Sequence, residues 1–296
     1  MDVLTLNGIT KYYGRIRALN NVSFSVPEGS VFGILGPNGS GKTTMLGIIM
    51  DILRPTSGNF LFFGAPPTAA IRKQIGTLLE TPNFYHYLSG ERNLRIAAEI
   101  KGKGLNQIDE VLRKVNLYQR KDSKFSTYSL GMKQRLAIAS CLLGDPQVLV
   151  FDEPTNGLDP VGIAEIRELI KNVATKGKTI IMASHLLDEV EKVCTHVGIL
   201  KMGDLLTAGK VDEVLVNEDI VELSAGNMQL LEQALASLNG YTSIKNQNEY
   251  IQLLFPVNTA KLEKINEHCF RNGVVLNHLR LKKKSLETKF LELTNQ

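Results

Sequence analysis

The segment from residue 36 to residue 43 reads Gly36-Pro37-Asn38-Gly39-Ser40-Gly41-Lys42-Thr43, and it decides the fold class. It matches the pattern G-x-x-x-x-G-K-[ST] at every fixed position. An apolar run, Val31 to Leu35, precedes it, and a segment with helical spacing, Gly41 to Met50, follows it. A buried strand, a glycine-rich turn and a helix in this order predict a loop that binds a polyphosphate. An ordinary glycine-rich turn is the alternative, and the complete match in this context disfavours it.

The residue types in this loop fit the chemistry of a nucleotide. Glycines at 36, 39 and 41 allow backbone N–H groups to point inward around phosphates, since they carry no Cβ. The helix that begins near Gly41 adds its positive end. Lys42 is expected to reach the β- and γ-phosphates, the Thr43 hydroxyl to ligate Mg²⁺, and Thr44 to belong to the same site. The predicted cofactors are therefore ATP and Mg²⁺.

A second predicted strand, Val148 to Phe151, ends in two carboxylates, Asp152 and Glu153. In open α/β sheets, ligands bind at the carboxyl ends of the strands. Asp152 is predicted to hold Mg²⁺ and its water shell, as a Walker B aspartate would, and Glu153 to polarise the attacking water. An Asp-Glu pair alone would be weak support, but together with the phosphate loop it predicts a nucleoside triphosphatase.

The order of the predicted elements indicates an α/β fold followed by a small α+β domain. The length of 296 residues is that of two domains, at roughly 150 residues each. Residues 1–210 alternate strands and helices, except for a helical insertion at about 84–145. Residues 211–296 follow a β-α-β-β-α-β order. Further strands are expected at Ile75 to Leu79, Thr179 to Ala183, Val197 to Leu200, Ile220 to Leu223 and Tyr250 to Leu254.

Composition limits the function classes. The chain is 43% hydrophobic and 22% charged, which excludes a disordered, collagen-like or disulfide-scaffold protein. The net charge of +4 is too small to indicate a nucleic-acid partner, and none is expected. The apolar stretches fall short of the ~20 residues that cross a bilayer, and the N-terminus shows no signal core, so a cytoplasmic protein is expected. The three cysteines are expected to be buried, reduced thiols: Cys141, Cys194 and Cys269.

A third motif indicates which class of P-loop ATPase the chain resembles. The residues just before the second acidic motif read Tyr128-Ser129-Leu130-Gly131-Met132-Lys133-Gln134-Arg135. This segment resembles the signature of the ATP-binding cassette (ABC) ATPases, L-S-G-G-Q followed by K/R-Q-R. The segment departs from it at Tyr128, Leu130 and Met132. A Ser129 hydroxyl, a permissive Gly131 and a helix N-terminus still provide a second anion site, although a capped helix alone would have the same sequence.

The resemblance extends in order along residues 1 to about 210, and it implies a P-loop NTPase of the ABC cassette type with a helical subdomain. Asn156-Gly157-Leu158-Asp159 resembles the family's D-loop. His185, just after a predicted strand, resembles the switch histidine that contacts the γ-phosphate. Tyr13 is similar to the aromatic residue that stacks on adenine, and Tyr12 is the alternative.

One departure from the family pattern indicates a subgroup. Glu80 stands where most members have glutamine. With the form of the signature found here, it resembles the ATPase subunits of bacterial peptide-antibiotic exporters, including those of bacitracin-type resistance and lantibiotic self-immunity. A carboxylate at residue 80 can ligate Mg²⁺ or its water, and it adds negative charge, so the Mg²⁺ dependence is expected to differ from that of a glutamine variant.

The resemblance implies an ATP-hydrolysing subunit that drives an exporter of a peptide antibiotic or another amphiphile. The expected partners are a separate integral-membrane permease and a second copy of this chain, in a head-to-tail dimer closed by ATP. The subunit would be peripheral on the inner face of the membrane. The alternative is a soluble ABC ATPase acting on the ribosome or DNA. A non-catalytic nucleotide sensor is disfavoured because the sequence contains Lys42, Asp152, Glu153 and His185.

Overall fold

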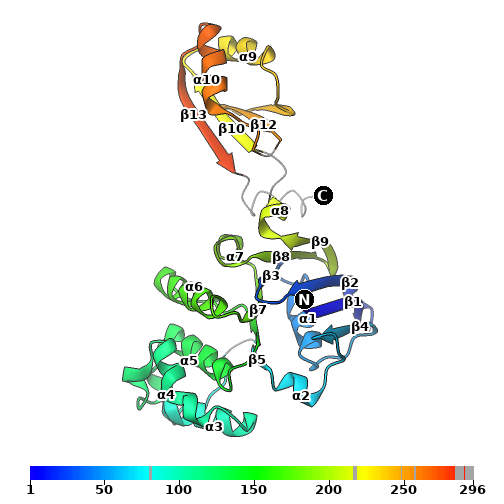
Figure 1. The fold of residues 1–296 in the computed structure, drawn as a ribbon, viewed down its shortest axis with the longest axis vertical. Coiled ribbons are helices and arrows are strands. Elements are labelled where there is room, and N and C mark those ends of the chain that lie inside the picture. Colours follow the sequence, from blue (N-terminus) through cyan, green and yellow to red (C-terminus); the bar gives the residue numbers. More distant parts are fainter. Residues whose placement is uncertain (80–81, 216–218, 248, 257, 284–289, 291–296) are drawn as a thin grey trace. The chain divides into compact units, whose positions relative to one another are not determined.

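The computed structural model describes residues 1–79, 82–215, 219–247, 249–256, 258–283 and 290. The chain divides into two compact units, Met1–Val211 and Asp212–Gln296 (Figure 1). Each unit has its own hydrophobic core and is described by itself. Among the described helices, none is both long enough and apolar enough to cross a membrane.

A six-stranded sheet forms the centre of the first unit. Its order is β5 (Ile75–Leu78), β6 (Val148–Asp152), β7 (Thr179–Ser184), β3 (Val31–Leu35), β8 (His196–Lys201) and β9 (Asp204–Lys210). The first five strands run parallel, and β9 pairs antiparallel with β8. Every residue of β3, β6 and β7 is buried, because helices cover both faces, as parallel sheets require. The prediction of an α/β fold with a parallel sheet is confirmed.

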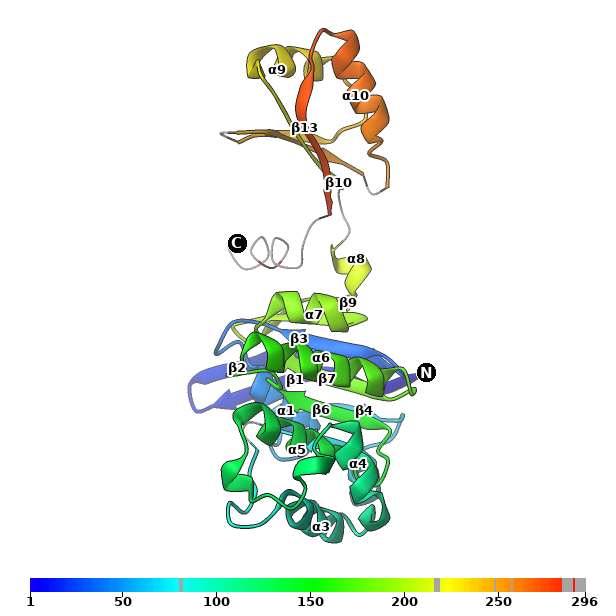
Figure 2. The ribbon, with the colours of Figure 1, turned by 90° about the vertical axis from the view of Figure 1, so that its left-hand side faces the viewer.

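Helices lie on both faces of this sheet. Helix α1 (Lys42–Ile49) lies on one side, and α6 (Pro160–Ala174) and α7 (Leu187–Val193) lie on the other (Figure 1). Three helices lie between β5 and β6 in the sequence and pack together: α3 (Gly90–Lys101), α4 (Ile108–Lys114) and α5 (Leu130–Leu142) (Figure 2). The short helix α2 (Ala69–Arg72) precedes β5. The helical subdomain expected from the sequence is therefore present.

A second, antiparallel sheet was not predicted. It has the order β2 (Ile16–Pro27), β1 (Asp2–Tyr13) and β4 (Ser57–Phe62). Its inner face packs on α1, where Leu6 and Ile9 share a core with Met45 and Leu46. The pairing of β1 with β2 changes register at four places along the two strands. Each shift breaks the period-two alternation that reveals a strand in a sequence, which explains why this sheet was missed.

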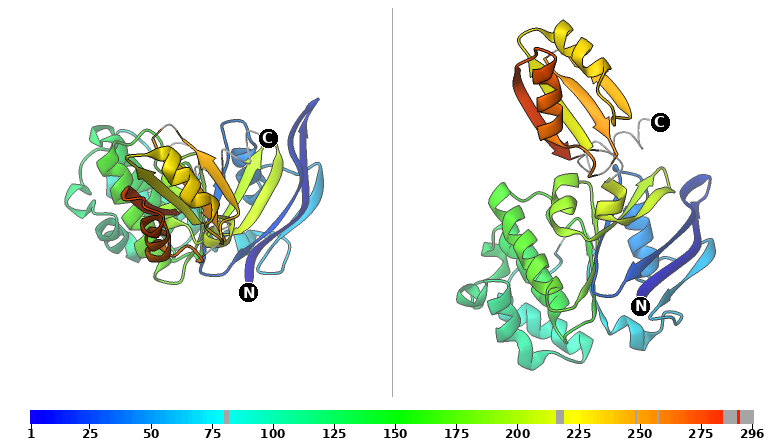
Figure 3. Two further views of the ribbon diagram at one scale, coloured as in Figure 1. Left: turned by 90° about the horizontal axis from the view of Figure 1, so that it is seen from above. Right: turned by 45° about the horizontal axis from the view of Figure 1, so that its top comes forward.

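The second unit has a β-α-β-β-α-β order, as expected from the sequence. Its elements are β10 (Asp219–Ala225), α9 (Met228–Ala236), β11 (Ser243–Asn246), β12 (Ile251–Phe255), α10 (Leu262–Arg271) and β13 (Leu276–Lys283). The strands form one antiparallel sheet in the order β11-β12-β10-β13. This is the ferredoxin-like arrangement, and both helices pack on one face of the sheet (Figure 3). The short helix α8 (Val211–Leu215) lies at the boundary between the units in the sequence.

Candidate active site

The phosphate-loop candidate lies between β3 and α1. A Cβ added to Gly41 would lie 2.5 Å from the Ala18 carbonyl oxygen, and its φ of +106° is one that only glycine adopts readily. At Gly36, a Cβ would lie 2.5 Å from the Leu200 carbonyl oxygen. Both glycines are therefore required by the close approach of neighbouring backbone, which holds the loop in a single tight conformation.

Lys42 is the first residue of α1, and its ammonium turns back over this loop. The side chain is only 6% exposed. Nζ donates hydrogen bonds to the carbonyl oxygens of Gly36, at 2.8 Å, and Pro37, at 3.3 Å. Within the described part of the chain, the buried Ser40 Oγ has no hydrogen-bond partner. A buried cation and an unsatisfied hydroxyl beside a helix N-terminus suit an anion with several oxygens, such as a polyphosphate.

A pocket of about 460 Å³ opens beside this loop. Seven of its residues belong to the predicted motifs: Asn38, Gly39, Gly41, Lys42, Thr43, Thr44 and Glu153. Four others were not predicted: Ile16, Arg17 and Ala18 from the start of β2, and Met202 from the turn between β8 and β9. No motif marks these four, because they reach the pocket through the antiparallel sheet and a turn rather than through the loop itself.

Two carboxylates stand at the end of β6. Asp152 is its last residue and is 3% exposed. Glu153 follows with a φ of +48°, a left-handed conformation that is unfavourable for a residue other than glycine by about 1–3 kcal/mol. Its backbone N–H donates to the Ala183 carbonyl oxygen at 3.0 Å, so β7 holds this conformation in place. The Glu153 side chain lines the pocket beside the phosphate loop.

The structure brings three predicted residues together around the Glu153 carboxylate. Glu153 Oε1 lies 3.6 Å from Lys42 Nζ, and Glu153 Oε2 lies 2.8 Å from His185 Nδ1. His185 is in the two-residue connection between β7 and α7, where the Leu186 N–H donates to Ser184 Oγ at 3.0 Å. A carboxylate held between a lysine and a histidine at the edge of this pocket has the chemistry to orient a water for attack on a phosphate bound there.

The chain is similar in sequence and in fold to known proteins. The family model described as ABC transporter matches residues 19–156. The bacitracin transport ATP-binding protein of Enterococcus faecalis is 33% identical, over 98% of this chain and 96% of that protein. The chain belongs to the ABC transporter family as an ATP-binding subunit. The lantibiotic transport ATP-binding protein of Streptococcus pyogenes is 37% identical, over 74% of this chain and 98% of that protein.

The solved structures agree with this membership. A dimeric ATP-binding cassette in a post-hydrolysis state, bound to ADP and Pi, superposes with a TM-score of 0.64 at 28% identity. The match covers 70% of this chain and 98% of that cassette. The ATPase fold predicted for the ABC cassette of this subunit is thereby confirmed.

In this ABC subunit, the segments that resemble the signature and the D-loop each supply a helix cap. Ser129 is the N-cap of α5, and its Oγ accepts a hydrogen bond from the Met132 N–H at 3.3 Å. Asp159 is the N-cap of α6, and its Oδ1 accepts one from the Gly162 N–H at 2.8 Å. Neither Ser129, Gly131 nor Asp159 lines the pocket beside the phosphate loop. These three residues are therefore not part of the pocket that Lys42 and Glu153 line.

Two further residues of the ABC subunit, Tyr13 and Glu80, were predicted to bind adenine and Mg²⁺, respectively. Tyr13 ends β1, opposite Ile16 of β2, and is 44% exposed. The ammonium of Lys11 lies 5.0 Å from the centroid of its ring. Tyr12 is equally exposed, so exposure does not choose between the two tyrosines. Glu80 lies outside the described residues.

Proposed function

We propose that this subunit hydrolyses ATP to drive export of a peptide antibiotic, or of a similar amphiphile, through a separate membrane permease. The contact of Glu153 with both Lys42 and His185, beside a polyphosphate pocket, is the observation that carries the proposal. The bacitracin and lantibiotic transport proteins among the relatives support the class of substrate. The subunit would work at the inner face of the membrane, bound to its permease.

Each site residue has a proposed part in hydrolysis. Lys42 binds the β- and γ-phosphates, and Glu153 orients the attacking water while His185 steadies Glu153 and the γ-phosphate. The oxygens of Thr43 and Asp152 suit Mg²⁺, a hard cation, and Glu80 is a third proposed ligand. When bound, Mg²⁺ would offset the charge of the phosphates. Tyr13 is proposed to stack on adenine.

A dimer would complete the site with the partner's signature. Among the described residues, and apart from its chain neighbours and the backbone of its own helix, only Leu158 Cδ2, at 3.9 Å, comes within 4 Å of a Cβ added to Gly131. Packing within one chain therefore does not require glycine here, and a helix generally favours alanine. A ligand that approaches the backbone from outside would explain the glycine. We infer that Ser129 and Gly131 meet the nucleotide of a second copy, with Asp159 at the same interface.

Turnover of the purified chain tests the proposal. Glu153→Gln is expected to bind ATP about as well as the wild type, because the side chain keeps its shape, and to lose about 10²- to 10³-fold in kcat. Glu168→Gln, on the exposed face of α6, is the control and should keep the wild-type rate. Wild-type turnover by Glu153→Gln would contradict the role of Glu153.

A further inference from the structure

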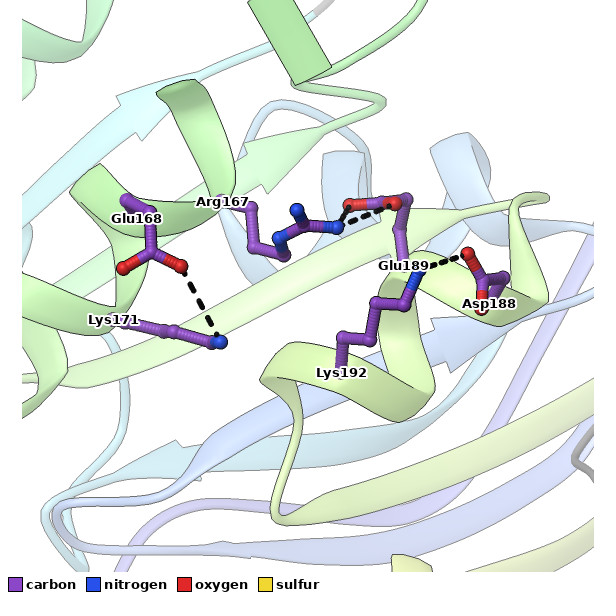
Figure 4. A network of polar contacts seen from close by, with 6 residues as sticks. All are labelled: Arg167, Glu168, Lys171, Asp188, Glu189 and Lys192. Atoms are coloured by element: carbon purple, nitrogen blue, oxygen red, sulfur yellow. Dashed lines mark hydrogen bonds and ion pairs between the residues drawn. The ribbon is translucent and has the colours of Figure 1, made fainter. Parts of the chain in front are cut away.

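An ion pair joins the two helices on the far side of the sheet from α1. Arg167 of α6 directs one nitrogen, Nη1, at both carboxylate oxygens of Glu189 of α7, at 3.1 and 3.4 Å (Figure 4). The side chains are 21% and 11% exposed, respectively. Because water has little access to it, this pair is screened less than a surface pair and holds a more definite geometry.

Two other ion pairs in the same region make a contrast. Lys171 Nζ lies 3.4 Å from Glu168 Oε1, and Lys192 Nζ lies 2.5 Å from Asp188 Oδ2. Each joins residues of one helix, three or four positions apart, and each is exposed (Figure 4). Exposed pairs of this kind contribute little to structure. Only the pair of Arg167 and Glu189, of the three drawn, can fix the position of α7 against α6.

Helix α7 is short, so the contacts near each of its ends set its position. It has seven residues, and in the described structure no side chain caps its first turn. Its buried face consists mainly of Val190, followed by Cys194 just beyond the helix, and both pack on Gly33 of β3. Just beyond the helix, the Thr195 N–H donates a hydrogen bond to the Val31 carbonyl oxygen at 2.9 Å, so β3 holds the C-terminal end. The ion pair adds a restraint nearer the N-terminal end, four residues after His185.

We propose that Arg167 and Glu189 are positioning residues, which hold α7 so that His185 meets the Glu153 carboxylate. The inference rests on the proposed function of that site. Leu186 joins His185 directly to the first residue of α7, so a displacement of the helix moves the imidazole. The contact of His185 Nδ1 with Glu153 Oε2 is 2.8 Å long, and a shift of about 1 Å would break it. Neither positioning residue lines the nucleotide pocket.

Steady-state ATP hydrolysis by the full chain tests this proposal. Arg167→Gln and Glu189→Gln are each expected to lower kcat by about 10- to 100-fold, as misplacement of a catalytic group by about 1 Å does. KM for ATP should stay within about threefold, because the residues that bind the phosphates are untouched. The controls Lys171→Gln and Asp188→Asn should stay within about twofold of the wild type.

A double variant separates positioning from general loss of structure. If Arg167 acts through His185, then Arg167→Gln should slow the His185→Ala variant by less than about twofold. An equal loss in both backgrounds would overturn the proposal. If a single variant does not fold, the charge-exchanged chain R167E/E189R tests the positioning role instead. We expect it to recover the wild-type kcat, and a folded but slow enzyme would overturn the proposal.

The outcome also distinguishes this inference from the function on which it rests. A wild-type chain without ATP hydrolysis would overturn the proposed function, and this inference with it. An active wild type whose Arg167→Gln variant keeps the full kcat would overturn the positioning role alone.

Discussion

Gly131 shows how a single residue can point to a surface outside its own chain. It lies in the first turn of α5, in a helical conformation, with space for a methyl group beside it. Gly41 and Gly36 differ from it, because neighbouring backbone excludes a Cβ at both positions. Local structure therefore explains the glycines of the phosphate loop but not the glycine of the signature.

The variant Gly131→Ala should separate folding from activity. Its free energy of unfolding is expected to equal that of the wild type or to exceed it by about 0.5–1 kcal/mol, because alanine favours a helix. ATP hydrolysis should fall by at least about tenfold, because the new Cβ would meet the partner's nucleotide. Urea unfolding and a turnover assay measure the two effects. A stable variant with full activity would contradict the role of Gly131.

At the scale of elements, β5 and α5 pack so closely that the strand needs a glycine. A Cβ added to Gly76 would lie 2.8 Å from Leu149 Cδ2 and 3.0 Å from the carbonyl carbon of Cys141, at the end of α5. A backbone atom cannot move aside as a side chain can. Gly76 thus sets the distance between the sheet and the last turn of the signature helix.

Gly76→Ala should weaken the first unit. We expect a loss of about 1–3 kcal/mol in the free energy of unfolding, the usual effect of overpacking. Urea titration followed by circular dichroism measures it, with Gly131→Ala as the control glycine that has room. Equal stability of the two variants would show that β5 and α5 are not held at this distance.

Elements also show what the sequence could and could not reveal. The parallel strands and the phosphate loop were predictable, because β3, β6 and β7 are continuous apolar runs followed by a motif. The antiparallel sheet was not, because register shifts in β1 and β2 hide its alternation. Its pocket residues, Ile16, Arg17 and Ala18, were missed with it. Lys42, Glu153 and His185 belong to three separate motifs. Their contact in the site depends on the order of the strands in the sheet, which the motifs do not specify.

At the scale of the whole molecule, the buried thiols report on the integrity of both units. Cys141 and Cys194 belong to the first unit and Cys269 to the second, and all three are free and buried, as expected from the sequence. Burial raises the pKa of the Cys141 thiol to about 12 and also raises the pKa values of Cys194 and Cys269. The folded chain therefore keeps these groups as unreactive thiols.

Alkylation should follow unfolding rather than pH in the native state. At pH 8.5 about half of the thiols of an unfolded chain are thiolates, whereas the folded chain keeps its thiols protonated. Iodoacetamide is expected to leave the native protein unmodified at this pH and to modify all three cysteines in urea, as read by mass spectrometry. Rapid labelling of Cys141 in the native protein would contradict its burial. Above about pH 8.5 only the unfolded chain loses protons from its thiols. The free energy of unfolding of the native protein should therefore fall as the pH rises above about 8.5.

We propose that ATP joins two copies of this chain through the phosphate loop of one and the signature-like segment of the other. Sedimentation of the Glu153→Gln variant measures whether ATP forms this dimer. With ATP and Mg²⁺ the variant is expected to sediment as a dimer, because bound ATP is not consumed, and without nucleotide as a monomer. Adding Gly131→Asp, which places a carboxylate against the phosphates, should restore the monomer. A Glu153→Gln chain that binds ATP and yet remains a monomer would show that ATP does not join two copies in this way.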